Sequence, residues 1–277
     1  MDKRNVTIVS NENPDRGALD IKEPFYIPIN NEIALFEAAH KERMAVLLKG
    51  PTGCGKTRFV AHMAWRLKLP LHTVSCHDDL TSSDLVGRYL IQGSDTVWQD
   101  GPLSRAVREG GICYLDEVVE ARKDTTVIIP PLSDDRRTLP IEKTGETLTA
   151  PDDFMLVISY NPGYQHILKE LKASTRQRFI ALEFDYPTEE LELEIITAES
   201  GLTGVEAERL VRLVRQMRGL TETGLESAPG TRLIVQAARL IKSGIDPAAA
   251  CEAAIVMPIT DDVDMHKAML DMVEAVF

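Results

Sequence analysis

A short glycine-rich stretch early in the chain carries the plainest chemistry of the sequence. Residues 49–58 read KGPTGCGKTR, with the spacing G-x-x-x-x-G-K-T. Glycines at this spacing let backbone N–H groups converge on phosphate oxygens. We expect the Lys56 ammonium to contact the phosphates of a nucleoside triphosphate, and the Thr57 hydroxyl to bind Mg²⁺. The expected nucleotide-binding residues are Gly50, Pro51, Thr52, Gly53, Cys54, Gly55, Lys56 and Thr57.

The residues on either side of this stretch give it the right structural context. Ala45–Leu48 is a short apolar run typical of a buried strand, and apolar residues recur at helical spacing from Phe59 to Leu67. A chance glycine turn before a helix is the alternative, and strand and helix together argue against it. Cys54 lies at a position of the loop where a small residue suffices, so we do not interpret it as a redox centre.

A pair of acids supplies the second half of the chemistry. The segment GICYLDE, residues 111–117, is an apolar strand that ends in Asp116 and Glu117. Because side chains alternate along a strand, the two carboxylates should point in different directions. We expect Asp116 to reach the Mg²⁺ shell, through water, and Glu117 to activate a water for attack on the γ phosphate. A solvated Asp-Glu pair at a strand end is the alternative.

Four further polar side chains suit phosphate chemistry. Another apolar strand, around residues 155–158, leads to Asn161, whose amide can contact both the γ phosphate and the attacking water. Arg176 and Arg178 precede an apolar strand, where an arginine can stabilise a transferring phosphoryl group from a neighbouring protein. Arg232 falls in the first turn of a helix, where the helix dipole disfavours a cation, so an anion nearby is expected. Each residue also has a plainer explanation. Asn161 could simply form an Asn-Pro turn, Arg176 and Arg178 could lie on a solvated face, and an acidic side chain could be the anion near Arg232.

Composition narrows the class of protein. The 277 residues include 31 basic and 43 acidic side chains, a net charge of −12, which argues against a nucleic-acid-binding protein. No apolar run is long enough to span a bilayer, and the N-terminus does not resemble a secretory signal, so we expect no membrane insertion. Four cysteines without paired spacing suit reduced thiols and a cytoplasmic location.

The chain changes character near residue 187. Residues 1–24 are mixed polar and are expected to form a loose arm, and residues 25–187 alternate strands with helices as a parallel α/β domain does. Residues 188–277 read as almost wholly helical. We therefore expect an α/β nucleotide-binding domain followed by a smaller helical domain.

Together these residues resemble an AAA+ ATPase of the MoxR branch, within the CbbQ/NirQ/NorQ group. The likeness covers roughly residues 25–275 and includes the stretches STRQRFIALEFDYP and PGTRLIVQAARLI. It implies a P-loop three-layer core with a parallel sheet and a C-terminal helical lid. It also implies a homo-oligomeric ring, usually a hexamer, with ATP and Mg²⁺ between neighbouring subunits.

The resemblance also implies a role for each candidate residue. Lys56 and Thr57 match the Walker A pair, and Asp116 and Glu117 match the Walker B pair. Asn161 and Arg232 match the first and second sensors. The arginine finger falls on Arg178 or Arg176.

Two expected hairpins fit the same group. Tyr89–Trp98 should form one, around a turn at residues 93–95, and residues 132–154 should form another around Gly145. In related rings such hairpins line or rim the central pore, and ordinary surface hairpins are the alternative.

Several functions are compatible with these residues and with the resemblance. One is the remodelling of a client protein with a partner that carries a von Willebrand factor A domain, of the CbbO type. On overall likeness to CbbQ we expect the client to be Rubisco, freed from inhibitory sugar phosphates. The alternative is maturation of nitric oxide reductase, as for NirQ and NorQ. A P-loop kinase and a DNA-directed ATPase are less well supported, because Glu117 favours hydrolysis and the chain is acidic.

Overall fold

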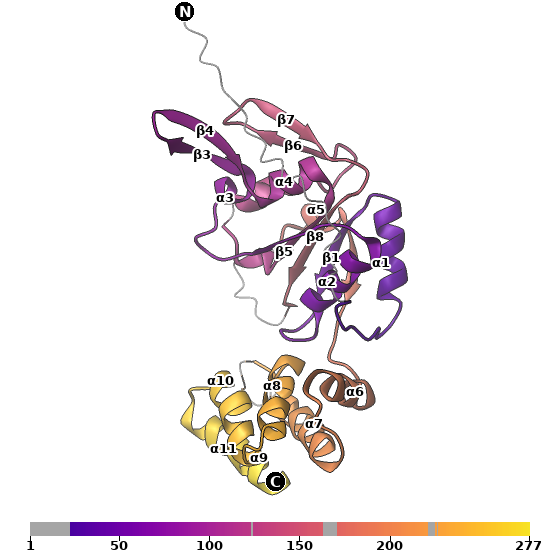
Figure 1. Cartoon of the computed structure of the whole chain (residues 1–277), viewed down its shortest axis with the longest axis vertical. Coiled ribbons are helices and arrows are strands. Elements are labelled where there is room, and N and C mark those ends of the chain that lie inside the picture. Colours follow the sequence, from indigo (N-terminus) through magenta and orange to yellow (C-terminus); the bar gives the residue numbers. More distant parts are fainter. Residues whose placement is uncertain (1–22, 123, 163–170, 221–224, 226) are drawn as a thin grey trace, which may run out of the picture. The chain divides into compact units, whose positions relative to one another are not determined.

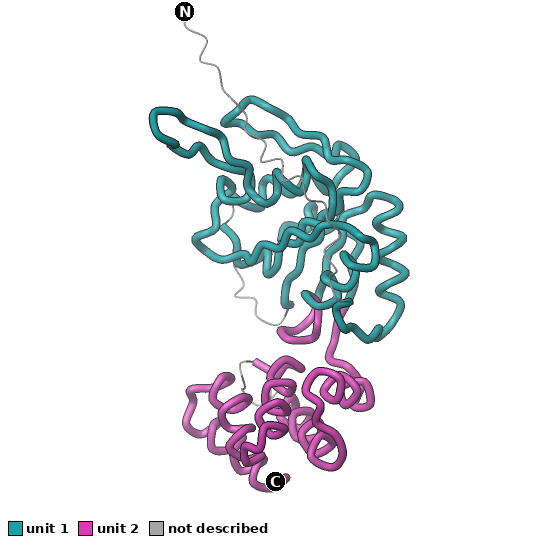
Figure 2. Tube along the Cα trace, in the orientation of Figure 1, with its two compact units in different colours: residues 1–49, 57–183 teal, residues 50–56, 184–277 magenta. Residues whose placement is uncertain are grey.

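The computed structural model describes residues 23–122, 124–162, 171–220, 225 and 227–277 of the chain. The described residues form two compact units (Figure 2). The first contains the residues up to 49 together with 57–183, and the second contains 50–56 together with 184–277. The expected arm over residues 1–24 lies almost wholly outside the described residues, and the domain boundary at residue 187 stays a prediction.

A five-stranded parallel sheet forms the centre of the first unit (Figure 1). Its strand order is β2-β5-β8-β1-β9, so the first strand of the chain lies between the last two strands of the sheet. The α/β fold with a parallel sheet is therefore confirmed. The strands are β1 (Ala45–Lys49), β2 (Leu71–Ser75), β5 (Gly111–Asp116), β8 (Phe154–Tyr160) and β9 (Phe179–Glu183).

The central strands are mostly apolar because both faces of the sheet are covered. In β1, Val46 and Leu48 point to one face and Leu47 to the other, and all three are buried. The side chain of Leu47 belongs to the same core cluster as Leu103 of helix α4. The helices of this unit are α1 (Glu32–Lys41), α2 (Lys56–Leu67), α3 (Ser82–Val86), α4 (Pro102–Glu109) and α5 (Ala173–Arg176).

Parallel strands bring their carboxyl ends to one edge of the sheet, and the candidate residues follow those ends. The glycine-rich loop begins directly after β1, Asp116 is the last residue of β5, and Asn161 follows β8. The sheet topology thus places three segments that are far apart in sequence at neighbouring strand ends.

The two predicted hairpins are both present, and they lie side by side in Figure 1. The first pairs β3 (Gly87–Gln92) with β4 (Asp95–Asp100), and the second pairs β6 (Thr138–Ile141) with β7 (Glu146–Thr149). The hydroxyl of Tyr89 in β3 donates to the carbonyl of Lys143 in the turn of the second hairpin over 3.3 Å. The hairpins therefore contact each other directly.

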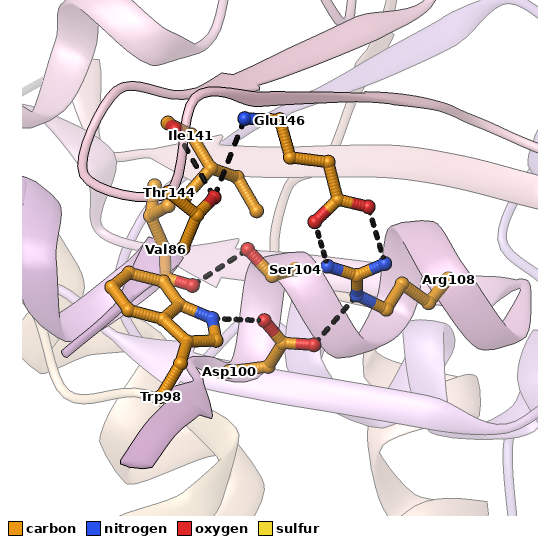
Figure 3. A network of polar contacts seen from close by, with 8 residues as sticks. All are labelled: Val86, Trp98, Asp100, Ser104, Arg108, Ile141, Thr144 and Glu146. Carbon is orange, nitrogen blue, oxygen red and sulfur yellow. Dashed lines mark hydrogen bonds and ion pairs between the residues drawn. The ribbon is translucent and has the colours of Figure 1, made fainter. Parts of the chain in front are cut away.

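Arg108 of α4 joins the two hairpins through a polar network (Figure 3). Its Nε donates to Asp100 at the end of β4 over 2.7 Å, and its Nη1 donates to Glu146 at the start of β7 over 2.8 Å. The indole of Trp98 donates to the other carboxylate oxygen of Asp100 over 2.7 Å. The guanidinium of Arg108 thus donates hydrogen bonds to one carboxylate from each hairpin. Both hairpins are therefore attached to α4 through this side chain.

The second unit contains a bundle of helices after residue 184. Helix α7 shows why the sequence folds this way: Ala207, Leu210, Val211, Val214 and Met217 recur at helical spacing and are all buried. The elements are α6 (Glu189–Ser200), α7 (Val205–Arg218), α8 (Thr231–Lys242), α9 (Pro247–Cys251), a π-helix (Glu252–Val256), α10 (Met257–Ile259) and α11 (Val263–Val276).

None of the helices that the structure describes is both long and apolar enough to cross a bilayer.

Candidate active site

The glycine-rich loop holds its lysine inward. Lys56 is the first residue of α2 and is only 7% exposed, and its ammonium donates to the carbonyls of Gly50 over 2.7 Å and Pro51 over 2.9 Å. A buried ammonium needs such acceptors, and phosphate oxygens can serve as well as carbonyls. The loop therefore keeps a charged donor at the N-terminal end of a helix, as anion binding requires.

Cys54 is a buried thiol within this loop. It is 4% exposed, and its Sγ lies 4.0 Å from the Lys56 ammonium. Burial raises the pKa of the Cys54 thiol, although the charge of Lys56 acts in the opposite direction. A raised pKa disfavours the reactive thiolate, which agrees with a packing role rather than a redox role.

Thr57 lies at the strand end that carries the first acid. Its hydroxyl donates to Oδ2 of Asp116 over 3.1 Å. The other oxygen of Asp116, Oδ1, accepts from the hydroxyls of Tyr114 and Ser159, each over 2.6 Å. Three hydroxyl donors thus fix the orientation of one carboxylate.

The contact with Asp116 also affects the phenol of Tyr114. Burial raises the pKa of Tyr114 well above its ordinary value, and the neighbouring Asp116 charge raises it further. Tyr114 therefore stays a neutral donor to the carboxylate across the physiological pH range.

Glu117 adopts an uncommon backbone conformation. Its φ of 55° and ψ of 47° lie in the left-handed region, which non-glycine residues occupy at a cost of about 1–2 kcal/mol. Its N–H donates to Ser159 Oγ over 3.0 Å, which holds the strained residue in place. Such strain at a candidate site is typical of a side chain that must point in one direction.

The amide of Asn161 meets the carboxylate of Glu117. Asn161 is 9% exposed, and its Nδ2 donates to Glu117 Oε1 over 3.2 Å. The two acids predicted to point apart do so: Asp116 faces Thr57, and Glu117 faces Asn161.

The three candidate arginines occupy different surroundings. Arg176 ends α5, and Arg178 follows two residues later, directly before β9. Arg178 Nε lies 3.7 Å from Asp134 Oδ2, and its Nη1 donates to the carbonyl of Ser174. Arg232 is exposed in the first turn of α8, as predicted.

Sequence reasoning missed Ser159, Tyr114 and Asp134. Ser159 and Tyr114 lie in apolar strands, where a hydroxyl at a buried position was the available signal. Their partners depend on how β5 pairs with β8, which local sequence does not state. Asp134 lies in the segment before β6, which sequence reasoning treated as part of a hairpin.

Comparisons with known proteins identify the family of the chain. Residues 45–179 match the family of AAA domains in the dynein-related subfamily, and residues 192–276 match the CbbQ/NirQ/NorQ C-terminal family. Protein NorQ of Paracoccus denitrificans is 59% identical over 94% of this chain and 96% of its own length. The chain belongs to the CbbQ/NirQ/NorQ family of AAA+ ATPases.

Other relatives extend the same picture. The denitrification regulatory protein NirQ of Pseudomonas aeruginosa is 59% identical over 91% of this chain and 96% of its own length. Protein CbbQ of Hydrogenophilus thermoluteolus is 53% identical over 92% of this chain and 96% of its own length.

Solved structures support the fold. A RuvB mutant of Thermotoga maritima matches with a TM-score of 0.53 at 18% identity, covering 88% of this chain and 68% of that one. NtrX of Brucella abortus, in complex with ADP, matches with a TM-score of 0.52 at 17% identity, covering 91% of this chain and 62% of that one. As an AAA+ ATPase, this chain binds a nucleotide and hydrolyses ATP to ADP and phosphate.

Proposed function

We propose that this ATPase uses ATP hydrolysis to remodel a client protein, together with a partner that carries a von Willebrand factor A domain. The observation that carries the hydrolytic part is the separation of two neighbouring carboxylates. Asp116 is held by Thr57, and Glu117 is held apart from it by Asn161. A site with one acid for a cation and another for water is suited to hydrolysis rather than to transfer onto a substrate hydroxyl.

We propose that Thr57 and Asp116 hold Mg²⁺ and that residues 50–56 hold the phosphates. The oxygen donors fit this cation: a hydroxyl and a carboxylate face each other at 3.1 Å, and hard oxygen ligands are what Mg²⁺ prefers. Bound Mg²⁺ neutralises negative charge on the β and γ phosphates. Lys56 adds a second positive charge from within the loop.

In this proposal Glu117 takes a proton from the attacking water. Asn161 orients the Glu117 carboxylate through its amide N–H and can turn the same amide toward the γ phosphate. The left-handed backbone of Glu117 supports this role, because strained backbone conformations are common at catalytic sites.

We further propose that the protein works as a homo-oligomeric ring, with six subunits as the expected number. Arg178 or Arg176 then acts as the finger for a neighbouring subunit, and Arg232 acts as the second sensor. Arg178 lies 3.7 Å from Asp134 of its own chain, a weak contact that a neighbouring nucleotide could replace. A ring and a trans-acting arginine also argue against a kinase.

The identity of the client protein is inferred from the similarity of this chain to its relatives. The relatives named NorQ and NirQ are 59% identical to this chain, against 53% for CbbQ. These values favour a client in denitrification, namely nitric oxide reductase, over the Rubisco expected from the sequence. Rubisco is the second candidate, supported by the likeness to CbbQ over 92% of the chain.

The test is a parallel assay of both clients with partner proteins from the same organism. We expect nitric oxide reductase activity to depend on this chain, the von Willebrand factor A partner and ATP. Rescue only of carboxylation by sugar-phosphate-blocked Rubisco would assign the chain to the second candidate. Rescue of neither client, from a protein that still hydrolyses ATP, would overturn the proposal.

The Glu117→Gln variant is the control for the role of hydrolysis. It should form the same oligomer and fail in the client assay. If Glu117→Gln rescued the client fully, nucleotide binding alone would be enough, and the proposed use of hydrolysis would be wrong.

A further inference from the structure

One carboxylate in the helical unit is completely buried. Glu192 of α6 is 0% exposed and accepts two hydrogen bonds from the guanidinium of Arg218 in α7, over 2.9 and 2.6 Å. Its Oε1 also accepts from the hydroxyl of Thr231 in α8 over 2.8 Å. A single acid therefore joins three helices. Buried ion pairs of this kind stabilise a fold little more than apolar side chains of equal volume, so this one invites a functional explanation.

The first branch of this network leads to the glycine-rich loop. The backbone N–H of Thr231 donates to the carbonyl of Gly53 over 3.2 Å. Gly230, the residue before Thr231, lies very close to Gly53 of the loop. A Cβ added to Gly230 would be 2.8 Å from the Cα of Gly53, and a Cβ added to Gly53 would be 2.9 Å from the Cα of Gly230. The start of α8 thus contacts the loop backbone to backbone, and Glu192 holds the residue that makes this contact.

The second branch reaches the neighbouring carbonyl of the loop. The guanidinium carbon of Arg218 lies 3.9 Å from the centre of the Tyr186 ring, a favourable cation–π position. The hydroxyl of Tyr186 lies 3.2 Å from the carbonyl oxygen of Thr52, to which it donates. Arg218 Nε also donates to the carbonyl of Pro229 over 2.9 Å, in the segment that leads into α8.

We propose that Glu192 and Arg218 are positioning residues for ATP hydrolysis. The buried pair holds Thr231 and Tyr186 against two consecutive carbonyls of the loop, those of Thr52 and Gly53. These carbonyls set the orientation of the peptide groups whose N–H donors face the phosphates. In this proposal the buried pair acts on the loop only through Thr231 and Tyr186.

The same contacts give the network a second effect. Arg232, the proposed second sensor, is the residue after Thr231, so the hydroxyl of Thr231 on Glu192 also fixes the backbone next to that arginine. The loop and the start of α8 are therefore held by one buried carboxylate.

The test uses two substitutions at Thr231 in the full-length, assembled protein. Thr231→Val keeps the shape of the side chain and removes the donor to Glu192, whereas Thr231→Ser keeps the donor. We expect Thr231→Val to raise the KM for ATP about five- to tenfold, the loss that one hydrogen bond corresponds to, and Thr231→Ser to return KM to within about twofold. Tyr186→Phe should also raise KM, because it removes the donor to Thr52 and keeps the ring beneath Arg218.

A matched control lies on the same two helices. Arg239 of α8 contacts Glu199 of α6 through a 3.1 Å ion pair and a bond to the Glu199 carbonyl, and its side chain is 58% exposed. Arg239→Gln should lower the melting temperature without changing KM. This variant separates loss of helix packing from loss of loop positioning.

Three results would overturn the proposal. An unchanged KM in Thr231→Val would show that the hydroxyl of Thr231 does not position the loop. A KM that rises equally in Arg239→Gln would show that any weakening of the helical unit has this effect. A Thr231→Ser variant as impaired as Thr231→Val would show that the lost methyl contacts, not the bond to Glu192, were responsible.

Discussion

The hydroxyl of Thr57 and the carboxylate of Asp116 face each other across 3.1 Å, although the two residues are 59 positions apart in sequence. The contact places a residue from the start of α2 beside the carboxyl end of β5. Tyr114 and Ser159 hold the second oxygen of Asp116, so three hydroxyl groups fix the orientation of the carboxylate. A hydroxyl and a carboxylate are hard oxygen donors, and this pair is therefore the proposed Mg²⁺ site.

The first prediction concerns this pair. Asp116→Asn keeps the size of the side chain and removes its charge, so the Mg²⁺ concentration for half-maximal ATPase activity should rise about tenfold or more. The measurement is phosphate release across a Mg²⁺ titration at saturating ATP. The exposed acid Asp153 supplies the control, since Asp153→Asn should leave the titration unchanged. A titration of Asp116→Asn that matches the wild type would remove Asp116 from the cation site.

The second prediction concerns the proposed base. Glu117→Gln should lower kcat by about 100-fold or more and leave nucleotide affinity nearly unchanged, because the base acts on water and not on binding. Asn161→Ala should lower kcat by less, since it loosens the carboxylate without removing it. Single-turnover hydrolysis and equilibrium nucleotide binding measure the two effects. Glu120→Gln, in the 3-10 helix that follows, should behave as wild type, and normal turnover by Glu117→Gln would disprove the assignment.

The third prediction concerns a site shared between subunits. Arg178→Ala subunits keep an intact loop, and Lys56→Ala subunits keep an intact Arg178, so mixed rings should regain part of the activity that each variant lacks alone. Arg176→Ala, tested in the same way, identifies which arginine acts on the neighbour. The measurement is ATPase activity across mixing ratios of subunits shown to exchange. Mixed rings that stay inactive at every ratio would exclude a trans-acting finger.

The fourth prediction concerns the two hairpins. Arg108→Gln removes the guanidinium that joins Asp100 to Glu146, so amide hydrogen exchange should rise in β3–β4 and β6–β7 together. Arg88 of β3 supplies the control, because its contact with Asp84 is 3.8 Å long and exposed, and Arg88→Gln should change neither hairpin. Faster exchange in only one hairpin would show that Arg108 does not couple them.

The fifth prediction gives the same network a pH dependence. The hydrogen bond from Arg108 lowers the pKa of Glu146 below its ordinary value of 4.5. A lowered folded-state pKa stabilises the hairpins above pH 4.5, and this contribution is lost as pH falls through the folded pKa. Exchange protection corrected for intrinsic rates should therefore fall in the wild type below pH 4.5. The protection should fall less in Glu146→Gln, which has no carboxylate to protonate. Identical pH profiles in the wild type and the variant would contradict the assignment of this pH dependence to Glu146.

Local sequence indicated the candidate residues better than it indicated the residues that hold them. The loop, Asp116, Glu117 and Asn161 could be proposed from sequence because each follows an apolar run that by itself predicts a strand. Ser159 and the role of Tyr114 were not found, because their contacts with Asp116 depend on the parallel register of β5 and β8.

The polar contacts of the helical unit could not be predicted from the sequence for a different reason. Glu192 and Arg218 lie in helices with many charged residues, where an acid and an arginine ordinarily face solvent. Their pairing depends on how α6, α7 and α8 pack, and that packing involves apolar residues many positions away. The left-handed backbone of Glu117 was likewise beyond prediction, since no glycine or asparagine marks it.

That backbone conformation of Glu117 has an evolutionary consequence. Glycine occupies the left-handed region without the cost that glutamate bears there, so on backbone grounds Glu117→Gly relieves strain while it removes the proposed base. A duplicated gene copy released from selection for ATPase activity would meet no barrier from backbone strain to this change. Position 117 is therefore where a copy retained only as a scaffold would be expected to lose its catalysis early.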